Sequence, residues 1–261
     1  MDRNKDYILE CCVDSVESAV AAAEGGADRL ELCAALIIGG ISPGIGLFEQ
    51  VRTSCDLPVR VLLRPRFGDF LYTDHEFEII RREVELFKNA GADGVVIGCL
   101  TSDGSLDMTK MSRLIKTAGT LKITLHRAFD VCADPIKTYN QAAELGIDTI
   151  LTSGQEKDCL AGMPLLIELC KLQEEANGPR IMAGAGVNPE VIRRFLTDTK
   201  ITSYHLSAKK IIDSGMQYRK AGVHMGLPAM SEYDIYRTDR AIVAAAKSVL
   251  MAHQAADNDG P

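Results

Sequence analysis

Two cysteines stand out because each follows a glutamate at the end of a short apolar run. Glu10 precedes Cys12 by two residues, and Glu31 precedes Cys33 by the same spacing. Two thiolates suit a soft ion such as Cu(I), and not Mg²⁺ or Ca²⁺. The chain contains no CxxC or paired-histidine spacing, so a structural zinc site is not expected. Cys12 and Cys33 are therefore the candidate metal ligands, and the other six cysteines are expected to be core residues.

A second group of residues could transfer protons. The segment His126-Arg127-Ala128-Phe129-Asp130 ends another apolar run with three polar groups in five residues. A histidine there could act as a general acid or base near neutral pH, with Asp130 or a glutamate orienting it. We expect Glu31 and His126 to form this acid–base pair. The chain has no GxSxG motif and no lysine in a Schiff-base context. A covalent mechanism is therefore supported only by Cys12 and Cys33 themselves.

A third group could bind an anion. Arg64 and Arg66 offer two guanidinium forks for a carboxylate or phosphate, unless Arg64 instead pairs with Glu10 and Glu31. Glycines at a helix N-terminus let backbone N–H groups converge on an anion, although such turns also serve simply to reverse the chain. The anion-binding candidates are Glu10, Arg64, Arg66, Arg127, Gly184, Gly186, His205 and Ser207.

Eight apolar runs must position these residues, and their starts are spaced about 28 residues apart, the pace of a βα unit. The runs cover residues 7–13, 28–33, 59–64, 94–98, 122–126, 148–152, 180–184 and 202–207. Between them, helix starts are indicated by capping boxes at Asp14–Glu17 and Thr73–Glu76, and by Asp134-Pro135 and Asn188-Pro189. Gly26, Gly91 and Gly146 mark helix ends.

This pattern predicts an α/β fold, a (β/α)₈ TIM barrel that forms a single domain over residues 1–261. An open doubly wound sheet is the alternative, disfavoured because no glycine fingerprint follows the first strand. Alternation along the strands collects the candidate residues at the carboxyl-terminal mouth, where barrel sites lie. The competing interpretation is a polar network that only satisfies itself. Residues 208–239 are expected to form an extended lid or assembly surface before a final helix near 240–254.

Composition limits the classes of function. The 261 residues are 46% hydrophobic and 25% charged, as in an ordinary globular protein. No run approaches the roughly 20 apolar residues that span a bilayer, and we expect no membrane partner. The net charge of −7 argues against a nucleic-acid partner. With no export signal evident, the eight cysteines are expected to be reduced thiols in the cytoplasm.

At these residues the sequence resembles the CutC copper-homeostasis family. The resemblance rests on LECCVDSVESA (9–19), GGADRLELCAAL (25–36), RPRFGDFLYTD (64–74), TLHRAFD (124–130), LTSG (151–154), IMAGAGV (181–187), HLSA (205–208) and SGMQYR (214–219). It implies a cytoplasmic TIM barrel assembled as a homo-oligomer, with a role in copper tolerance, trafficking or Cu(I) binding. It also implies copper ligation by Cys12 and Cys33.

Three positions depart from the pattern of that family: Ile38 replaces a glutamate, Gly44 a serine, and Phe67 a glycine. The first two departures are expected to remove polar contacts from the mouth, and Phe67 to narrow it.

Three hypotheses follow. The first is Cu(I) binding by Cys12 and Cys33. The second is a metal-independent barrel enzyme of lyase, isomerase or hydrolase type for a small anionic or sugar-like substrate. In this enzyme Arg64 and Arg66 would bind the anion while Glu31 and His126 move protons. The third is an assembly scaffold that uses residues 208–239 as its interface.

Overall fold

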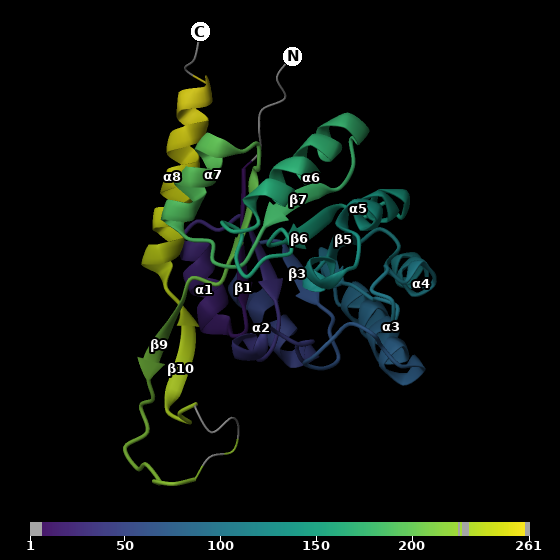
Figure 1. Ribbon diagram of the computed structural model, residues 1–261. Helices are drawn as coiled ribbons and strands as arrows, with labels where there is room; N and C mark the ends of the chain where they lie inside the picture. The colour runs from purple at the N-terminus through teal and green to yellow at the C-terminus, as the bar shows by residue number, and fades with distance from the viewer. Residues whose placement is uncertain (1–6, 224, 226–229, 259–261) are drawn as a thin grey trace.

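Eight parallel strands close into a barrel in the order β1 to β8, surrounded by helices (Figure 1). The computed structural model describes residues 7–223, 225 and 230–258. The barrel strands are β1 (Ile8–Val13), β2 (Arg29–Leu32), β3 (Val59–Leu62), β4 (Gly94–Ile97), β5 (Lys122–Leu125), β6 (Thr149–Thr152), β7 (Arg180–Ala183) and β8 (Ser203–Leu206). Because β1 pairs with β8, the predicted TIM barrel is confirmed and the open sheet is excluded.

The helices alternate with the strands as the sequence predicts. They are α1 (Val16–Glu24), α2 (Ile45–Ser54), α3 (Asp74–Asn89), α4 (Met108–Ala118), α5 (Pro135–Glu144), α6 (Met163–Ala176), α7 (Pro189–Asp198) and α8 (Arg240–Asn258), with short 3₁₀ helices η1 (Leu36–Ile38) and η2 (Arg127–Val131). Within the described residues, none of these helices combines the length and apolar character that crossing a membrane requires.

Local capping signals set most of the helix starts. Thr73 forms a reciprocal capping box with Glu76, and Asp134 and Asn188 cap α5 and α7. The capping box predicted at Asp14–Glu17 is wrong. Ser15 caps α1 by accepting a hydrogen bond from the backbone N–H of Ser18. Asp14 lies one residue too early to cap α1 and instead accepts a hydrogen bond from the N–H of Leu36.

Strand alternation divides the apolar side chains into two sets. Leu9, Cys11 and Leu30 are fully buried in the large core between the strands and the helices. Cys12 and Cys33 belong instead to a small cluster inside the barrel with Leu62 and Val96. The two cysteines therefore lie on the inner side of the barrel, as the alternation predicts.

The register of β1 places the polar residues of neighbouring strands side by side. Glu10 stands opposite Arg29 on one side and His205 on the other, while Cys12 stands opposite Glu31. Two layers of polar residues thus occur along β1: one at Glu10, and one nearer the carboxyl-terminal mouth at Cys12.

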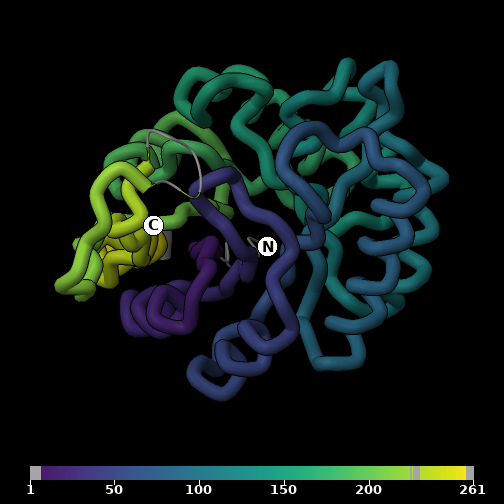
Figure 2. Tube along the Cα trace, turned by 90° about the horizontal axis from the view of Figure 1, so that it is seen from below, coloured from purple at the N-terminus to yellow at the C-terminus, as the bar shows by residue number. Residues whose placement is uncertain are grey.

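An antiparallel hairpin leaves the barrel at the end of β8. Its strands are β9 (Lys209–Asp213) and β10 (Asp234–Thr238), which project beyond the carboxyl ends of the barrel strands in Figure 1. Figure 2 views the molecule from that side and shows the hairpin at the rim of the barrel. We call β9, β10 and the described residues between them the arm. Residues 224 and 226–229 of the expected 208–239 segment lie outside the described residues.

Candidate functional site at the barrel mouth

A cavity of about 430 Å³ opens among the carboxyl ends of the barrel strands. This volume is within the range of pockets that hold small ligands. Eight of the thirteen candidate residues line the cavity: Cys12, Glu31, Arg64, His126, Arg127, Gly186, His205 and Ser207. Cys33, Glu10, Arg66, Asp130 and Gly184 are not among its lining residues.

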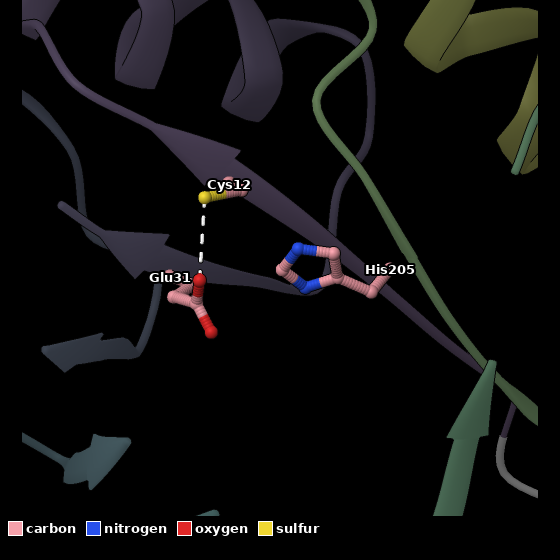
Figure 3. A group of neighbouring side chains, drawn as sticks. All are labelled: Cys12, Glu31 and His205. Atoms are coloured by element: carbon pink, nitrogen blue, oxygen red, sulfur yellow. Dashed lines mark hydrogen bonds between the residues drawn. The ribbon is translucent and has the colours of Figure 1, made fainter. Parts of the chain in front are cut away.

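Three side chains from the adjacent strands β8, β1 and β2 converge at one side of this cavity (Figure 3). Cys12, Glu31 and His205 each offer a ligand atom, and these atoms lie within 4.8 Å of one another. The Cys12 thiol donates a hydrogen bond to Glu31 Oε1 at 3.3 Å. The set combines sulfur, oxygen and nitrogen donors, which is the chemistry of a transition-metal site.

Cys33 adds a second sulfur behind Cys12. The two Sγ atoms are 3.7 Å apart, and Cys33 is fully buried. Gly40 covers it, because a Cβ at position 40 would lie 3.5 Å from Cys33 Sγ. An ion ~2.3 Å from each sulfur, the usual Zn–S distance, would see them at an angle of about 107°. That angle leaves room for a third ligand.

His205 is held by a buried carboxylate below it. Its Nδ1 lies 2.8 Å from Glu10 Oε1, and Glu10 also pairs with Arg29. Burial opposes ionisation of Glu10, but Arg29 and His205 outweigh it and lower the pKa of Glu10 to about 2. Glu10 is therefore a charged residue that orients His205 and leaves its Nε2 as the ring nitrogen for a ligand.

Burial governs the protonation of the other two members. Burial and the nearby Glu10 carboxylate raise the pKa of Glu31, and Glu31 Oε2 has no hydrogen-bond partner among the described residues. The hydrogen bond to Cys33, together with burial, raises the pKa of the Cys12 thiol well above its ordinary value. The Cys12 thiol therefore favours its protonated form in the absence of a ligand, and it donates its proton to Glu31 Oε1.

His126 occupies another side of the cavity and is oriented by the backbone. Its Nδ1 accepts a hydrogen bond from the N–H of Ala128 at 3.1 Å, and its Nε2 has no partner in the described part of the chain. A Cβ at Gly98 would lie 2.6 Å from His126 Cε1, so Gly98 makes room for the ring. Burial and the charge of Arg64 lower the pKa of His126 to about 3. The imidazole is therefore neutral at pH 7, with its proton on Nε2.

The expected orientation of His126 by Asp130 or a glutamate is wrong. Asp130 instead accepts hydrogen bonds from Thr152 Oγ1 at 2.5 Å and from the N–H of Ser153 at 3.0 Å, and pairs with Arg127. The short helix η2 turns directly after His126, which carries Asp130 towards β6. Asp130 thus joins two loops of the barrel.

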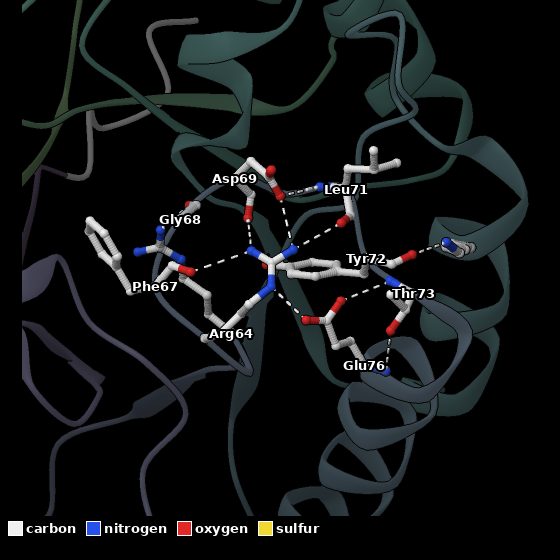
Figure 4. Close-up of polar contacts among 10 residues, drawn as sticks. Arg64, Phe67, Gly68, Asp69, Leu71, Tyr72, Thr73 and Glu76 are labelled. Carbon is white, nitrogen blue, oxygen red and sulfur yellow. Dashed lines mark hydrogen bonds and ion pairs between the residues drawn. The ribbon is translucent and has the colours of Figure 1, made fainter.

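The two arginines of the RPR motif have different partners, and Figure 4 shows Arg64 beside Gly68. Arg64 lines the cavity, and it donates hydrogen bonds to the carbonyls of Gly39, Gly40 and Gly68. The alternative, in which Arg64 pairs with Glu10 and Glu31, is not found: Glu10 pairs with Arg29 and His205. Arg66 lies beyond the strand end and pairs with Glu76 and Asp69, so it stabilises the loop before α3.

The glycine turn after β7 contributes unevenly. The N–H of Gly184 donates to the carbonyl of Thr152, so it is not available to an anion. Gly186 lines the cavity with a φ of 80°. Ser207 also lines it, after β8. Gly184 instead provides space, because a Cβ there would lie 2.5 Å from Leu151 Cδ1.

The three departures lie outside the cavity lining. Gly44 is the N-cap of α2 and makes no side-chain hydrogen bond, so its effect is on the helix. Ile38 ends η1, and Phe67 is 66% exposed. Phe67 does not line the cavity itself, and its ring centroid lies 6.0 Å from Cζ of Arg64, which does.

Nine lining residues were not among the candidates predicted from the sequence, and two of them, Phe70 and Lys209, carry an aromatic ring and a charge. Lys209 follows β8 by three residues, so the rule that strand ends meet at the mouth could have found it. The loop after β3 brings Phe70 to the cavity, and no periodic signal marks that loop.

Comparison with known proteins agrees with this architecture. The model of the CutC family matches residues 7–210. The chain belongs to the CutC family. CutC family proteins of Salmonella schwarzengrund and Salmonella enteritidis are each 41% identical over 249 residues, which is 95% of this chain and 99% of theirs.

Solved structures extend the comparison to the fold. The copper homeostasis protein CutC of Streptococcus agalactiae superposes with a TM-score of 0.73 at 26% identity, covering 77% of this chain and 98% of its own. Thiamine phosphate pyrophosphorylase of Pyrococcus furiosus has a TM-score of 0.56 at 16% identity over 96% of this chain and 98% of its own, a likeness of fold alone.

Proposed function

We propose that this CutC-family protein binds Cu(I) at the mouth of its barrel and serves copper homeostasis in the cytoplasm. Cys12 and Cys33 supply two sulfur ligands, and His205 lies beside Cys12 as a further nitrogen donor. The observation that carries the proposal is the 3.7 Å separation of the two sulfurs beside the Cys12–Glu31–His205 group.

The donor chemistry favours a soft ion. Two sulfurs and one imidazole match the preference of Cu(I), whereas a carboxylate oxygen is a harder ligand. Glu31 has a different task in this proposal. Because Cys12 already donates to Glu31 Oε1 at 3.3 Å, that oxygen is placed to receive the proton that the thiol loses on binding.

The surroundings of the sulfurs fit a reducing compartment. All eight cysteines are free and buried, and Cys12 is 4% exposed. Free thiols persist in the cytoplasm, where they are kept reduced. A thiol pair with so little exposed surface is also shielded from oxidants.

Anaerobic titration with Cu(I) against a coloured Cu(I) chelator tests the proposal. Wild type is expected to bind one Cu(I) per chain with thiolate charge-transfer absorption. Cys12→Ser should abolish this binding, and Cys33→Ser and His205→Ala should each weaken it by at least about tenfold. Cys55→Ser is the matched control, since Cys55 is a buried thiol at the end of α2, and it should bind as wild type.

Equal uptake by wild type and the Cys12→Ser/Cys33→Ser variant would overturn the proposal. A parallel titration with Zn²⁺ separates the two donor sets. If Zn²⁺ binds and Cu(I) does not, and Glu31→Gln abolishes Zn²⁺ binding, the site is a Cys–Glu–His centre for a harder ion.

We also propose that the protein assembles as a homo-oligomer through the arm. The arm exposes a group of large apolar side chains: Ile211, Ile212, Met216, Tyr218, Val223 and Met225. Exposed apolar groups of this kind mark protein–protein contact sites. A second copy of the chain, which carries the same exposed apolar side chains, is the partner that fits the arm.

A further inference from the structure

Arg64 is a buried cation without an anionic partner. Its relative exposure is 9%, and no carboxylate of the described residues lies within ion-pair distance of it. Its hydrogen bonds go to the carbonyls of Gly39, Gly40 and Gly68, which are neutral, and its Nε has no partner. Burying a charge without a counter-charge is costly, so this guanidinium is prepared for an anion that the chain itself does not supply.

A second unpartnered donor belongs to the same wall of the cavity. The Phe70 ring joins the two groups: its centroid is 4.7 Å from that of His126 and 5.0 Å from Arg64 Cζ. His126 Nδ1 accepts a hydrogen bond from Ala128, so the neutral ring carries its proton on Nε2. Nε2 and Arg64 Nε are both shielded from water. We call Arg64, Phe70 and His126 the donor wall.

The other charges of the cavity do not compensate Arg64. Arg127 is already paired with Asp130. Glu31 is hydrogen-bonded to Cys12 through Oε1, and its Oε2 has no partner. The donor wall therefore carries one uncompensated positive charge and one neutral donor, while Glu31 Oε2 offers a separate polar contact in the same cavity.

We propose that the mouth cavity binds a small carboxylate metabolite, with its carboxylate on Arg64 and His126 Nε2–H and a further polar group of the ligand on Glu31 Oε2. One carboxylate balances the charge of Arg64, and a guanidinium matches its planar shape. The cavity volume of about 430 Å³ suits a ligand of this size.

This inference goes beyond copper binding, because the donor wall includes none of the proposed metal ligands. Metal-free protein is therefore the sample for its test. Thermal unfolding and calorimetric titration are measured with a panel of α-hydroxy, α-oxo and α-amino carboxylates, each beside its neutral amide. Inorganic phosphate and phosphate monoesters form the second arm. At least one carboxylate is expected to raise the unfolding temperature saturably, and its amide is not.

Variants then locate the carboxylate. Arg64→Met should weaken binding of that carboxylate by at least about tenfold, because it removes a charge-assisted hydrogen bond. His126→Asn should weaken it by about tenfold, since asparagine can keep the acceptor for the Ala128 N–H but lacks the Nε2–H donor. Arg82→Met is the matched control, because Arg82 is an exposed arginine on α3 whose side chain is 76% exposed.

Three results would overturn the inference. The wild type is stabilised by no carboxylate of the panel, or it is stabilised only by phosphates. The third is that the Arg64→Met variant binds the carboxylate as tightly as the wild type. If circular dichroism shows that Arg64→Met does not fold, His126→Asn decides the matter. Unchanged affinity in that folded variant would then refute the role of the donor wall.

Discussion

His126 and His205 both line the mouth cavity, but their neighbours differ in charge. Burial acts against protonation of both rings. For His205, the carboxylates of Glu31 and Glu10 outweigh burial and raise its pKa. For His126, the guanidinium of Arg64 adds to burial and lowers its pKa to about 3. One side of the cavity therefore holds a histidine that readily takes a proton, and the other a histidine that stays neutral.

The low pKa of His126 makes stability depend on pH. An unfolded histidine titrates near 6.5, so between pH 6.5 and pH 3 the unfolded chain binds more protons than the folded one. Stability therefore falls as the pH drops through this window, by about 2 kcal/mol at pH 5. Urea unfolding at pH 7.5 and pH 5 should show a loss in wild type that exceeds the loss in His126→Asn by about 2 kcal/mol. The same pH dependence in both proteins would contradict the assignment.

At the level of single residues, sequence alternation predicts the face of a side chain but not its depth. Cys12 and Cys33 were expected on adjacent strands facing inwards, and they lie there. Glu10 shares their face, yet it stands two residues lower in β1, where Arg29 and His205 enclose it. Arg66 lies beyond β3, where the alternation of a strand no longer applies.

Among the elements, α2 is a helix whose N-cap residue, Gly44, provides no side-chain hydrogen bond. Gly44 has extended backbone angles, φ −71° and ψ 148°, and no side chain to accept a hydrogen bond from the first turn. A Cβ at this position would meet no atom within 4 Å. The glycine therefore leaves a capping position open that a small polar residue would fill without strain.

Gly44→Ser should stabilise the protein by about 0.5–1 kcal/mol, through a helix cap and a less flexible unfolded chain. Gly44→Ala is the control, because it adds the Cβ without the hydroxyl. Chemical denaturation should rank serine above glycine and alanine below serine. If alanine stabilises as much as serine, the gain does not come from capping.

The regular elements were predictable because their signals are local. The predicted runs matched the eight barrel strands closely, since almost every strand residue is buried and apolar residues make up much of each strand. Loops were less predictable because their contacts come from distant parts of the chain. Asp14 illustrates this: its partner is the backbone of Leu36, 22 residues away.

At the scale of the whole molecule, the arm stands apart from the barrel but is anchored beside the mouth. Lys209 at its start lines the cavity. At its end, the Thr238 hydroxyl donates to the carbonyl of Ser207, and the Thr238 N–H donates to Ser18 Oγ. A partner subunit bound to the arm would therefore contact a segment whose two ends adjoin the site.

The Ile211→Glu/Tyr218→Glu variant tests the role of the arm. These side chains are 57% and 72% exposed, so the substitutions should leave the fold intact and place charges in the proposed interface. Light scattering coupled to gel filtration should show a homo-oligomer for wild type and a monomer for the variant. Ile79→Glu is the control, because Ile79 is an exposed apolar residue on α3, and this variant should assemble as wild type. A monomeric wild type would refute assembly through the arm.

Because the barrel closes between its first and last strands, β1 and β8, the site can form only late in the synthesis of the chain. Cys12 and Glu31 are only 19 residues apart, whereas Glu10 and His205 are separated by 195. At ribosomal rates of about 5–20 residues per second, β1 waits roughly 10–40 s for its second neighbour to be synthesised. A nascent chain thus carries Cys12 and Cys33 well before His205 and the last strand emerge. The thiols need protection by the cell during that interval, before the finished barrel encloses them.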